Sequence, residues 1–138
     1  MNQKFKKTKQ KTVYLAGGFH TGWQDTVKTR LPYVKYLDPR VHNFQKKEDY
    51  TKWDLNAIKN SDVIFAYLES SNPGGYAMVL EIGYAKALNK TIVLVNEKFA
   101  PQSKESKYFE MVVASVDKHY DNLTDGIKYL DKLCSNPK

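Results

Sequence analysis

The sequence has almost no cysteine and no long apolar run, and each absence excludes a class of protein. Cys134 is the one cysteine among 138 residues, so no disulfide forms within the chain. No apolar run approaches the roughly 18 residues that cross a membrane, and the N-terminus lacks the apolar segment of a signal peptide. We therefore expect a protein of the reducing cytoplasm that has no membrane partner and an unreactive Cys134.

Acidic residues are absent from the first eleven positions, which contain five lysines. These lysines account for most of the net charge of +7, so that residues 12–138 carry only +2 between them. We predict a basic flexible leader over residues 1–11 and a single domain over residues 12–138. Because the folded part is close to neutral, a nucleic-acid partner is not expected, although binding through the leader stays open as an alternative.

Short apolar segments alternate with segments of helical spacing along the rest of the chain. Strands are expected at residues 12–16, 33–37, 62–68, 91–95 and 116–120. Helices are expected at residues 23–31, 51–60 (with Thr51 as the N-cap), within 72–90, 103–115 and 121–133. Strands rich in Val, Ile and Leu that alternate with helices indicate an α/β fold. We predict a doubly wound three-layer sandwich around a parallel sheet of about five strands, as in flavodoxin-like and Rossmann-like proteins.

In such folds, ligands bind beyond the carboxyl ends of the strands. That rule selects the loops at residues 17–22, 38–50 and 69–76 as candidate sites. The first loop, G-G-F-H-T-G, has glycines at a spacing that matches neither a dinucleotide-binding motif nor a phosphate loop. A loop that approaches a small ligand and a tight turn without a ligand are equal alternatives for it.

Two groups of polar residues in these loops allow more than one interpretation. Asp38 and Arg40 end the second predicted strand, where they can bind a sugar hydroxyl or a phosphate or simply pair with each other. Pairing is the interpretation that we favour. His20 and His42 are single loop histidines with no second ligand at metal spacing, so no metal site is expected.

The helix after the N-P-G-G-Y turn carries a carboxylate where an apolar residue is expected. At about 100° per residue, Glu81 lies inside the apolar stripe of this helix. The stripe consists of Ala77, Leu80, Tyr84, Ala85 and Leu88. Burial raises the pKa of a carboxyl group unless hydrogen-bond donors hold the charged form. Glu81 therefore either faces a pocket together with a donor or reaches solvent from the rim of the stripe, and periodicity leaves both open.

A second carboxylate, Asp54, lies on another predicted helix. Two acids that face one cavity are suited to glycosyl transfer, because one attacks or stabilises the anomeric carbon while the other handles protons. An ionised carboxylate below the sugar ring also stabilises the positive charge of the oxocarbenium-like transition state. Glu81 and Asp54 are therefore the candidate catalytic pair.

Three stretches of the sequence resemble the nucleoside 2-deoxyribosyltransferase family, and together they cover most of residues 12–95. They are V-Y-L-A-G-G-F (13–19), Y-T-K-W-D-L-N-A-I-K-N-S-D-V-I (50–64) and L-E-I-G-Y-A-K-A-L-N-K-T-I-V-L-V (80–95). The opening stretch, with Trp23 and D-P-R, is similar to a divergent branch of the family that is described as deoxyribosyltransferase-like.

The resemblance implies a role for each of three residues. Glu81 matches the nucleophile, which attacks C1′ of a 2′-deoxynucleoside, expels the base and forms a glycosyl-enzyme intermediate. A second base or water then attacks, so that the configuration is retained. Tyr14 matches the tyrosine whose hydroxyl holds that glutamate, and Asp54 matches the aspartate that serves in base protonation and sugar positioning.

The resemblance also implies a binding pocket and its partners. Gly17, Gly18 and Phe19 would line the pocket, with the ring of Phe19 or Trp23 stacked on the base. The further candidate substrate-binding residues are Asp38, Arg40, Ser70, Asn72 and Gly75. Family members share sites across subunits, so a homo-oligomer, a dimer or larger, is expected. The implied small-molecule partner is a nucleoside or nucleotide, and no cofactor is implied.

Two departures from the family pattern leave the reaction open. The turn S-S-N-P-G-G-Y replaces the usual acidic turn before the nucleophile, with Asn72 as the nearest polar substitute. The C-terminus C-S-N-P-K shows no match to the asparagine and chain-end carboxylate with which family enzymes often complete a neighbouring site. Sugar transfer between bases is the interpretation that we favour slightly. The alternatives are a nucleoside 5′-monophosphate N-glycosidase, with phosphate donors from Gly17, Gly18, Ser70 and Ser71, and a non-catalytic protein that binds a nucleotide-derived ligand.

Overall fold

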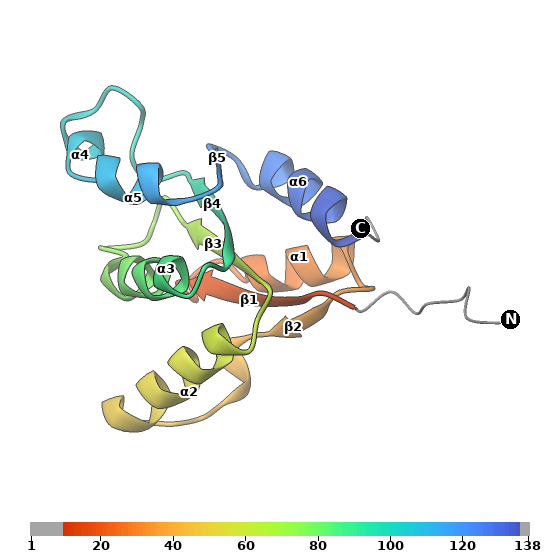
Figure 1. The fold of residues 1–138 in the computed structure, drawn as a ribbon. Helices are drawn as coiled ribbons and strands as arrows, with labels where there is room; N and C mark the ends of the chain where they lie inside the picture. Colours follow the sequence, from red (N-terminus) through yellow and green to blue (C-terminus); the bar gives the residue numbers. More distant parts are fainter. Residues whose placement is uncertain (1–9, 136–138) are drawn as a thin grey trace, which may run out of the picture.

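A five-stranded parallel sheet forms the centre of the molecule (Figure 1). The structure is a computed structural model that describes residues 10–135. The strands are β1 (Thr12–Gly17), β2 (Lys35–Leu37), β3 (Val63–Leu68), β4 (Thr91–Asn96) and β5 (Lys118–Tyr120). Their order is β2-β1-β3-β4-β5, and every neighbouring pair is parallel. This confirms the predicted doubly wound fold, in which ligands bind where the winding reverses, here between β1 and β3.

Helices cover both faces of the sheet (Figure 1). On one face lie α1 (Trp23–Arg30) and α6 (Leu123–Ser135), and on the other lie α2 (Lys47–Lys59), α3 (Tyr76–Ala87) and α5 (Glu110–Ser115). Side chains of a strand point alternately to its two faces. In β1, Val13 and Leu15 pack on the side of α1 and α6, whereas Tyr14 and Ala16 pack on the side of α2 and α3. This alternation turns Tyr14 toward the helix that carries Glu81.

Helix α2 begins earlier than predicted, at Lys47 instead of Thr51. Glu48 and Asp49 lie in its first turn, where the helix dipole favours negative charge. The predicted loop at residues 38–50 therefore contains the first turn of α2 and, before it, a short 3-10 helix, η1 (Pro39–Val41).

The predicted helix at residues 103–115 is in fact two short helices, α4 (Lys104–Lys107) and α5. The break falls at Phe109, whose backbone leaves the helical conformation at φ −107° and ψ 1°. Its ring is buried and packs against the ring of Phe99, 5.2 Å away. The core contact of Phe109 thus overrides the helical spacing. The two outer strands, β2 and β5, are each shorter than the segments predicted for them.

The remaining predictions of this kind concern the ends of the chain. The basic leader predicted over residues 1–11 falls mostly on residues 1–9, which lie outside the described residues. Among residues 10–135, no helix is long and apolar enough to cross a membrane. Cys134 is half-buried in α6, and burial raises the pKa of its thiol to about 11, so the thiol stays protonated at neutral pH.

Two helical glycines provide a matched test of the packing on the sheet. A Cβ atom at Gly126 in α6 would lie 2.3 Å from a methyl carbon of the buried Val95, whereas a Cβ atom at Gly83 in α3 would meet no atom within 4 Å. We expect Gly126→Ala to lower the free energy of unfolding by about 1–3 kcal/mol. Gly83→Ala should raise it by up to about 1 kcal/mol, because alanine favours helix. Urea unfolding measures both, and equal midpoints for Gly126→Ala and the wild type would contradict the close approach of α6 to β4.

Candidate active site

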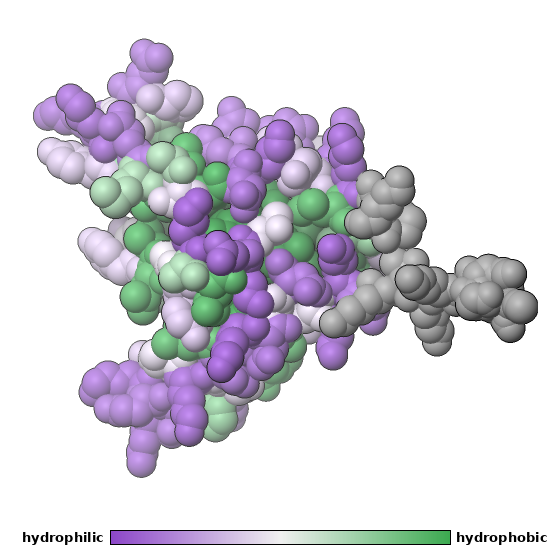
Figure 2. Space-filling model, in the orientation of Figure 1, coloured by the Kyte–Doolittle hydropathy of each residue, from purple (hydrophilic) through white to green (hydrophobic). Residues whose placement is uncertain are grey.

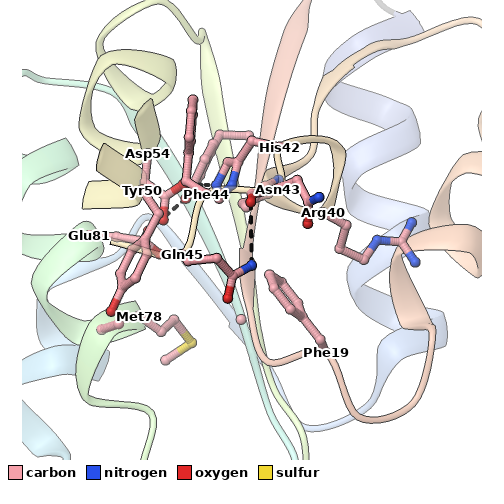
Figure 3. Close-up of a pocket in the computed structure, with 14 residues that line it drawn as sticks. Phe19, Arg40, His42, Asn43, Phe44, Gln45, Tyr50, Asp54, Met78 and Glu81 are labelled. Atoms are coloured by element: carbon pink, nitrogen blue, oxygen red, sulfur yellow. Dashed lines mark hydrogen bonds and ion pairs between the residues drawn. The ribbon is translucent and has the colours of Figure 1, made fainter. Parts of the chain in front are cut away.

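A cavity of about 550 Å³ opens at the carboxyl end of β1, between η1, α2 and α3 (Figure 3). Its volume lies within the range of small-molecule pockets in proteins. Six residues predicted from the sequence line it: Tyr14, Gly17, Phe19, Arg40, Asp54 and Glu81. The cavity therefore brings together side chains from β1, the β1–α1 loop, η1 and two helices.

The hydroxyl of Tyr14 donates a hydrogen bond to Oε2 of Glu81 across 2.6 Å. Tyr14 is fully buried, and Glu81 is only 7% exposed, so the rim position that the sequence left open for Glu81 is excluded. Gly75 caps the N-terminus of α3 in the left-handed conformation, at φ 76°, where a side chain would be strained. The turn therefore fixes where α3 begins. The alternation of side chains along β1 fixes the direction in which the Tyr14 hydroxyl points.

Burial makes ionisation of Glu81 costly, and Tyr14 offsets only part of that cost. Burial raises the pKa of Glu81 to about 7, the hydrogen bond from Tyr14 acts to lower it, and the charge of Asp54 acts to raise it. Burial and the neighbouring Glu81 raise the pKa of Tyr14 far above its ordinary value, so Tyr14 keeps its proton. At neutral pH, Glu81 is therefore divided between its carboxylate and its acid form, with Tyr14 as a permanent donor.

Asp54 is the second carboxylate of the cavity and projects from α2 (Figure 3). It is half-buried, and burial raises its pKa, while a hydrogen bond and the charge of His42 act to lower it. Nε2 of His42 lies 3.2 Å from Oδ1 of Asp54. The two acids that the sequence suggested as a pair thus face the same cavity, each with its own hydrogen-bonding neighbour.

The predicted apolar stripe of α3 was wrong. The buried residues of the helix are Met78, Glu81, Ile82 and Ala85. Of the stripe residues other than Ala85, Ala77, Leu80 and Leu88 are exposed and Tyr84 is only partly buried. Because α3 is apolar almost all round, the helical wheel has no polar side from which to orient it. Contact with the sheet decides the rotation, and it places Glu81 on the buried face.

The glycine loop after β1 contributes one glycine and one aromatic ring to the cavity. Gly17 has φ 149°, and a Cβ atom there would lie 2.4 Å from the backbone oxygen of Tyr67, so no other residue fits. Gly18 does not line the cavity; its Cα faces the side chains of Glu69 and Asn72. Phe19 lines the cavity and remains exposed, which leaves its ring free to stack on a ligand.

Asp38 and Arg40 pair with each other, the interpretation that we favoured from the sequence. The Arg40 guanidinium donates to both carboxylate oxygens of Asp38 and to Asp25. Nζ of Lys28 lies 2.7 Å from Asp38. Although burial acts to raise it, the pKa of Asp38 is held below its ordinary value by Arg40 and Lys28. Asp38 is buried and does not line the cavity, whereas Arg40 does.

Four other predicted residues do not line this cavity. Trp23 is 2% exposed and packs edge-on against Tyr67 in the core, so the prediction that it stacks on a base is wrong. Ser70 lines a separate cavity that residues of α4 and α5 also line. The buried side chain of Asn72 accepts a hydrogen bond from the backbone of Gly74, and Gly75 caps α3. Asn72 and Gly75 therefore shape the turn.

The segment that follows η1 supplies half of the lining residues that sequence reasoning missed. It was selected as a site loop without any assignment to its individual side chains. The segment contributes His42, Asn43, Phe44 and Gln45, and the other additional lining residues are Pro39 of η1, Tyr50 of α2, and Ala77 and Met78 of α3. The available signal was the aromatic and amide-rich stretch V-H-N-F-Q directly after D-P-R at the carboxyl end of a strand.

The sequence matches a known protein family. The family model for nucleoside 2-deoxyribosyltransferase-like proteins matches residues 10–99, which include Tyr14, Asp54 and Glu81. No curated protein matches the chain by sequence.

Solved structures share the fold at low sequence identity. A 2-deoxyribosyltransferase from Leishmania mexicana superimposes with a TM-score of 0.68 at 21% identity, over 88% of this chain and 97% of that one. The 2-deoxyribosyltransferase from Bacillus psychrosaccharolyticus gives 0.66 at 20% identity, over 86% and 91%. A CMP N-glycosidase from Clostridium botulinum gives 0.56 at 23% identity, over 88% and 99%. At these identities the likeness establishes the fold alone.

The raised pKa of Glu81 predicts how stability depends on pH. Between the ordinary pKa of 4.5 and the folded value of about 7, the folded state holds a proton that the unfolded state releases, so the stability contributed by Glu81 falls as pH rises. Glutamine does not titrate. From pH 4.5 to pH 8, Glu81→Gln should therefore gain stability relative to the wild type, on the order of 3 kcal/mol. Urea unfolding at several pH values measures this gain, with Glu105→Gln on the exposed surface of α4 as the control variant. A constant difference between Glu81→Gln and the wild type would contradict the raised pKa.

Proposed function

Because the chain belongs to the nucleoside 2-deoxyribosyltransferase-like family, we propose that it is an enzyme that breaks the N-glycosidic bond of a 2′-deoxynucleoside and passes the sugar to a second base. The observation that carries this proposal is the hydrogen bond between Tyr14 and Glu81 inside a cavity that also contains Asp54. A buried carboxylate with one fixed donor keeps its second oxygen available to attack a carbon atom.

The proposed reaction has two halves. In the first, an oxygen of Glu81 forms a bond to C1′, the bond from C1′ to the base breaks with its electron pair on the base nitrogen, and Asp54 protonates the base. In the second, the new base attacks C1′, Glu81 leaves as a carboxylate, and Asp54 takes the proton of the new base. Two inversions give retention of configuration. The first half requires ionised Glu81 and protonated Asp54 at the same time, so the two acids must hold one proton between them. Activity should therefore fall as pH rises through about 7, where that proton is lost.

The lining of the cavity favours a neutral deoxynucleoside over its monophosphate. Arg40 is the one lysine or arginine that lines it among residues 10–135, and its guanidinium is already bound by Asp25 and Asp38. The rings of Phe19, Phe44 and Tyr50 offer apolar surface for a base. Gly17 also lines the cavity, but Gly18 does not, and Ser70 lies in the separate cavity, which weakens the set of phosphate donors expected for a monophosphate N-glycosidase.

The substrate is tested by incubating the protein with deoxynucleosides and their 5′-monophosphates, with and without acceptor bases, and separating the products by HPLC. We expect base exchange on neutral deoxynucleosides, and a loss of at least about 10³-fold in kcat for Glu81→Gln. Glu105→Gln serves as the matched control and should retain full activity. Free base released from the monophosphate alone would replace this proposal with the N-glycosidase. Tight ligand binding without turnover would indicate a non-catalytic binder. If neither the wild type nor Glu81→Gln forms any product, catalysis through Glu81 is refuted.

We also propose that the chain forms a homo-oligomer through the outer faces of α3 and α5. Leu80 on α3 is 61% exposed and Met111 on α5 is 82% exposed. Tyr76, in the same helix as Leu80, and Tyr108, just before α5, are also exposed. Figure 2 shows apolar side chains gathered over α3 and α5, whereas the N-terminal end of α2 is hydrophilic. Contiguous apolar surface of this kind is typical of interaction sites.

Light scattering coupled to size-exclusion chromatography tests the oligomer. The wild type should have a mass of at least two chains, and Leu80→Glu should shift it to one chain, because a charge would be buried without a partner. Lys86→Glu, on an exposed position of the same helix, should leave the mass unchanged. A wild type with the mass of one chain would contradict the proposal.

A further inference from the structure

The segment after η1 carries a histidine to the second carboxylate of the cavity. Nε2 of His42 lies 3.2 Å from Oδ1 of Asp54, and Figure 3 shows the two side chains directed toward each other. The imidazole is held on two sides by aromatic rings. It stacks on Phe44 at 5.1 Å between ring centroids and meets Trp53 edge-on at 4.9 Å. The direction of its nitrogen atoms is therefore fixed by packing.

The other ring nitrogen assigns the proton. Nδ1 of His42 is buried and has no hydrogen-bond partner among the described residues. A buried N–H group without an acceptor is costly and rare in proteins, whereas an acceptor without a donor is better tolerated. A neutral imidazole carries its proton on one nitrogen only. The proton therefore belongs on Nε2, which donates it to Oδ1 of Asp54.

No other hydrogen bond within the described part of the chain holds Asp54. The ionisable groups that line the cavity with it are Glu81, Tyr14, Arg40, Tyr50 and His42. The hydroxyl of Tyr14 is directed to Glu81, and the guanidinium of Arg40 is directed to Asp25 and Asp38. An ionised Glu81 has no proton to donate to Asp54. The rotation of the Asp54 carboxyl group therefore depends on His42.

We propose that His42 is a positioning residue that acts through Asp54 in the reaction proposed above, on which this inference rests. The Nε2–H group of His42 donates a hydrogen bond to Oδ1 of Asp54, so that the acid proton of Asp54 is on Oδ2 and directed toward the cavity. As the bond from C1′ breaks, its electron pair passes to the base nitrogen, which takes the proton from Oδ2, while Glu81 forms its bond to C1′. Asp54 is left as a carboxylate that His42 stabilises through Oδ1. In the second half, the proton of the attacking base returns to Oδ2.

A substrate whose base needs no proton separates this role from a merely structural one. An N7-methylated purine deoxynucleoside loses its base as a neutral molecule, whereas the unmethylated compound requires protonation. His42→Phe keeps an aromatic ring between Phe44 and Trp53 but removes the donor. We expect it to lower kcat/KM about 10- to 100-fold on the unmethylated purine deoxynucleoside, and less than about threefold on the N7-methylated one.

Two controls sharpen this comparison. Asp54→Asn should show the same dependence on the leaving base, and His42→Phe should cause no further loss in the Asp54→Asn background. His119 is an exposed histidine of β5, and His119→Phe should leave kcat/KM unchanged on both substrates. An equal loss on both substrates for His42→Phe, or additive losses in the double variant, would overturn the positioning role.

Nitrogen-15 NMR of the histidine rings tests the proton assignment without any turnover. The signals of His42 are identified by their disappearance in His42→Phe. At pH 8, we expect a protonated Nε2 and an unprotonated Nδ1 in the wild type, and a mixture of the two neutral forms in Asp54→Ala. A wild-type ring protonated on Nδ1 would overturn the inference. If the wild type cleaves neither substrate, the proposed function fails, and the NMR result still decides the arrangement of His42 and Asp54.

Discussion

The hydrogen bond between Tyr14 and Glu81 is the interaction on which the rest of the site depends. It joins residues that are 67 positions apart, at a place where burial opposes ionisation of the carboxyl group. It requires Tyr14 to point to the α3 side of the sheet, and it requires α3 to begin directly after the left-handed Gly75. Strand parity, turn conformation and helix rotation are therefore all constrained by a single donor and acceptor.

The two carboxyl groups of the cavity differ in the donor that each one faces. Glu81 faces a phenol that retains its proton, because burial and the nearby acids raise the pKa of Tyr14. Asp54 faces an imidazole on a separate segment, and the ion pairs of Asp38 with Lys28 and of Arg40 with Asp25 anchor that segment to α1. Different surroundings for two acids are a general means by which one pocket separates a nucleophile from an acid. The two donors come from different segments, β1 and the segment after η1, so each hydrogen bond can be removed without the other.

Much of the fold could be predicted from the sequence because buried parallel strands have a strong apolar signal. T-V-Y-L-A and T-I-V-L-V required no tertiary information, and the G-G-Y turn located the start of α3. The rotation of α3 could not be predicted, since Leu80 and Ile82 are equally apolar and only contact with the sheet distinguishes them. Trp23 was misassigned because aromatic rings serve cores and ligands alike. The segment at residues 41–46 has no period, so its place in the cavity depended on ion pairs made by Asp38 and Arg40 with α1.

The buried face of α3 has a consequence for how such a protein can change over generations. One residue inserted into or deleted from the N-P-G-G-Y turn would rotate the helix by about 100°. An insertion would carry Glu81 from its place beside Tyr14 to the buried place of Ile82, and a deletion would carry Lys86 to the buried place of Ala85. Either change separates Glu81 from Tyr14 and sets an unpaired charged side chain against the sheet, which is costly. The length of this turn is therefore constrained by the stability of the domain as well as by the geometry of the cavity.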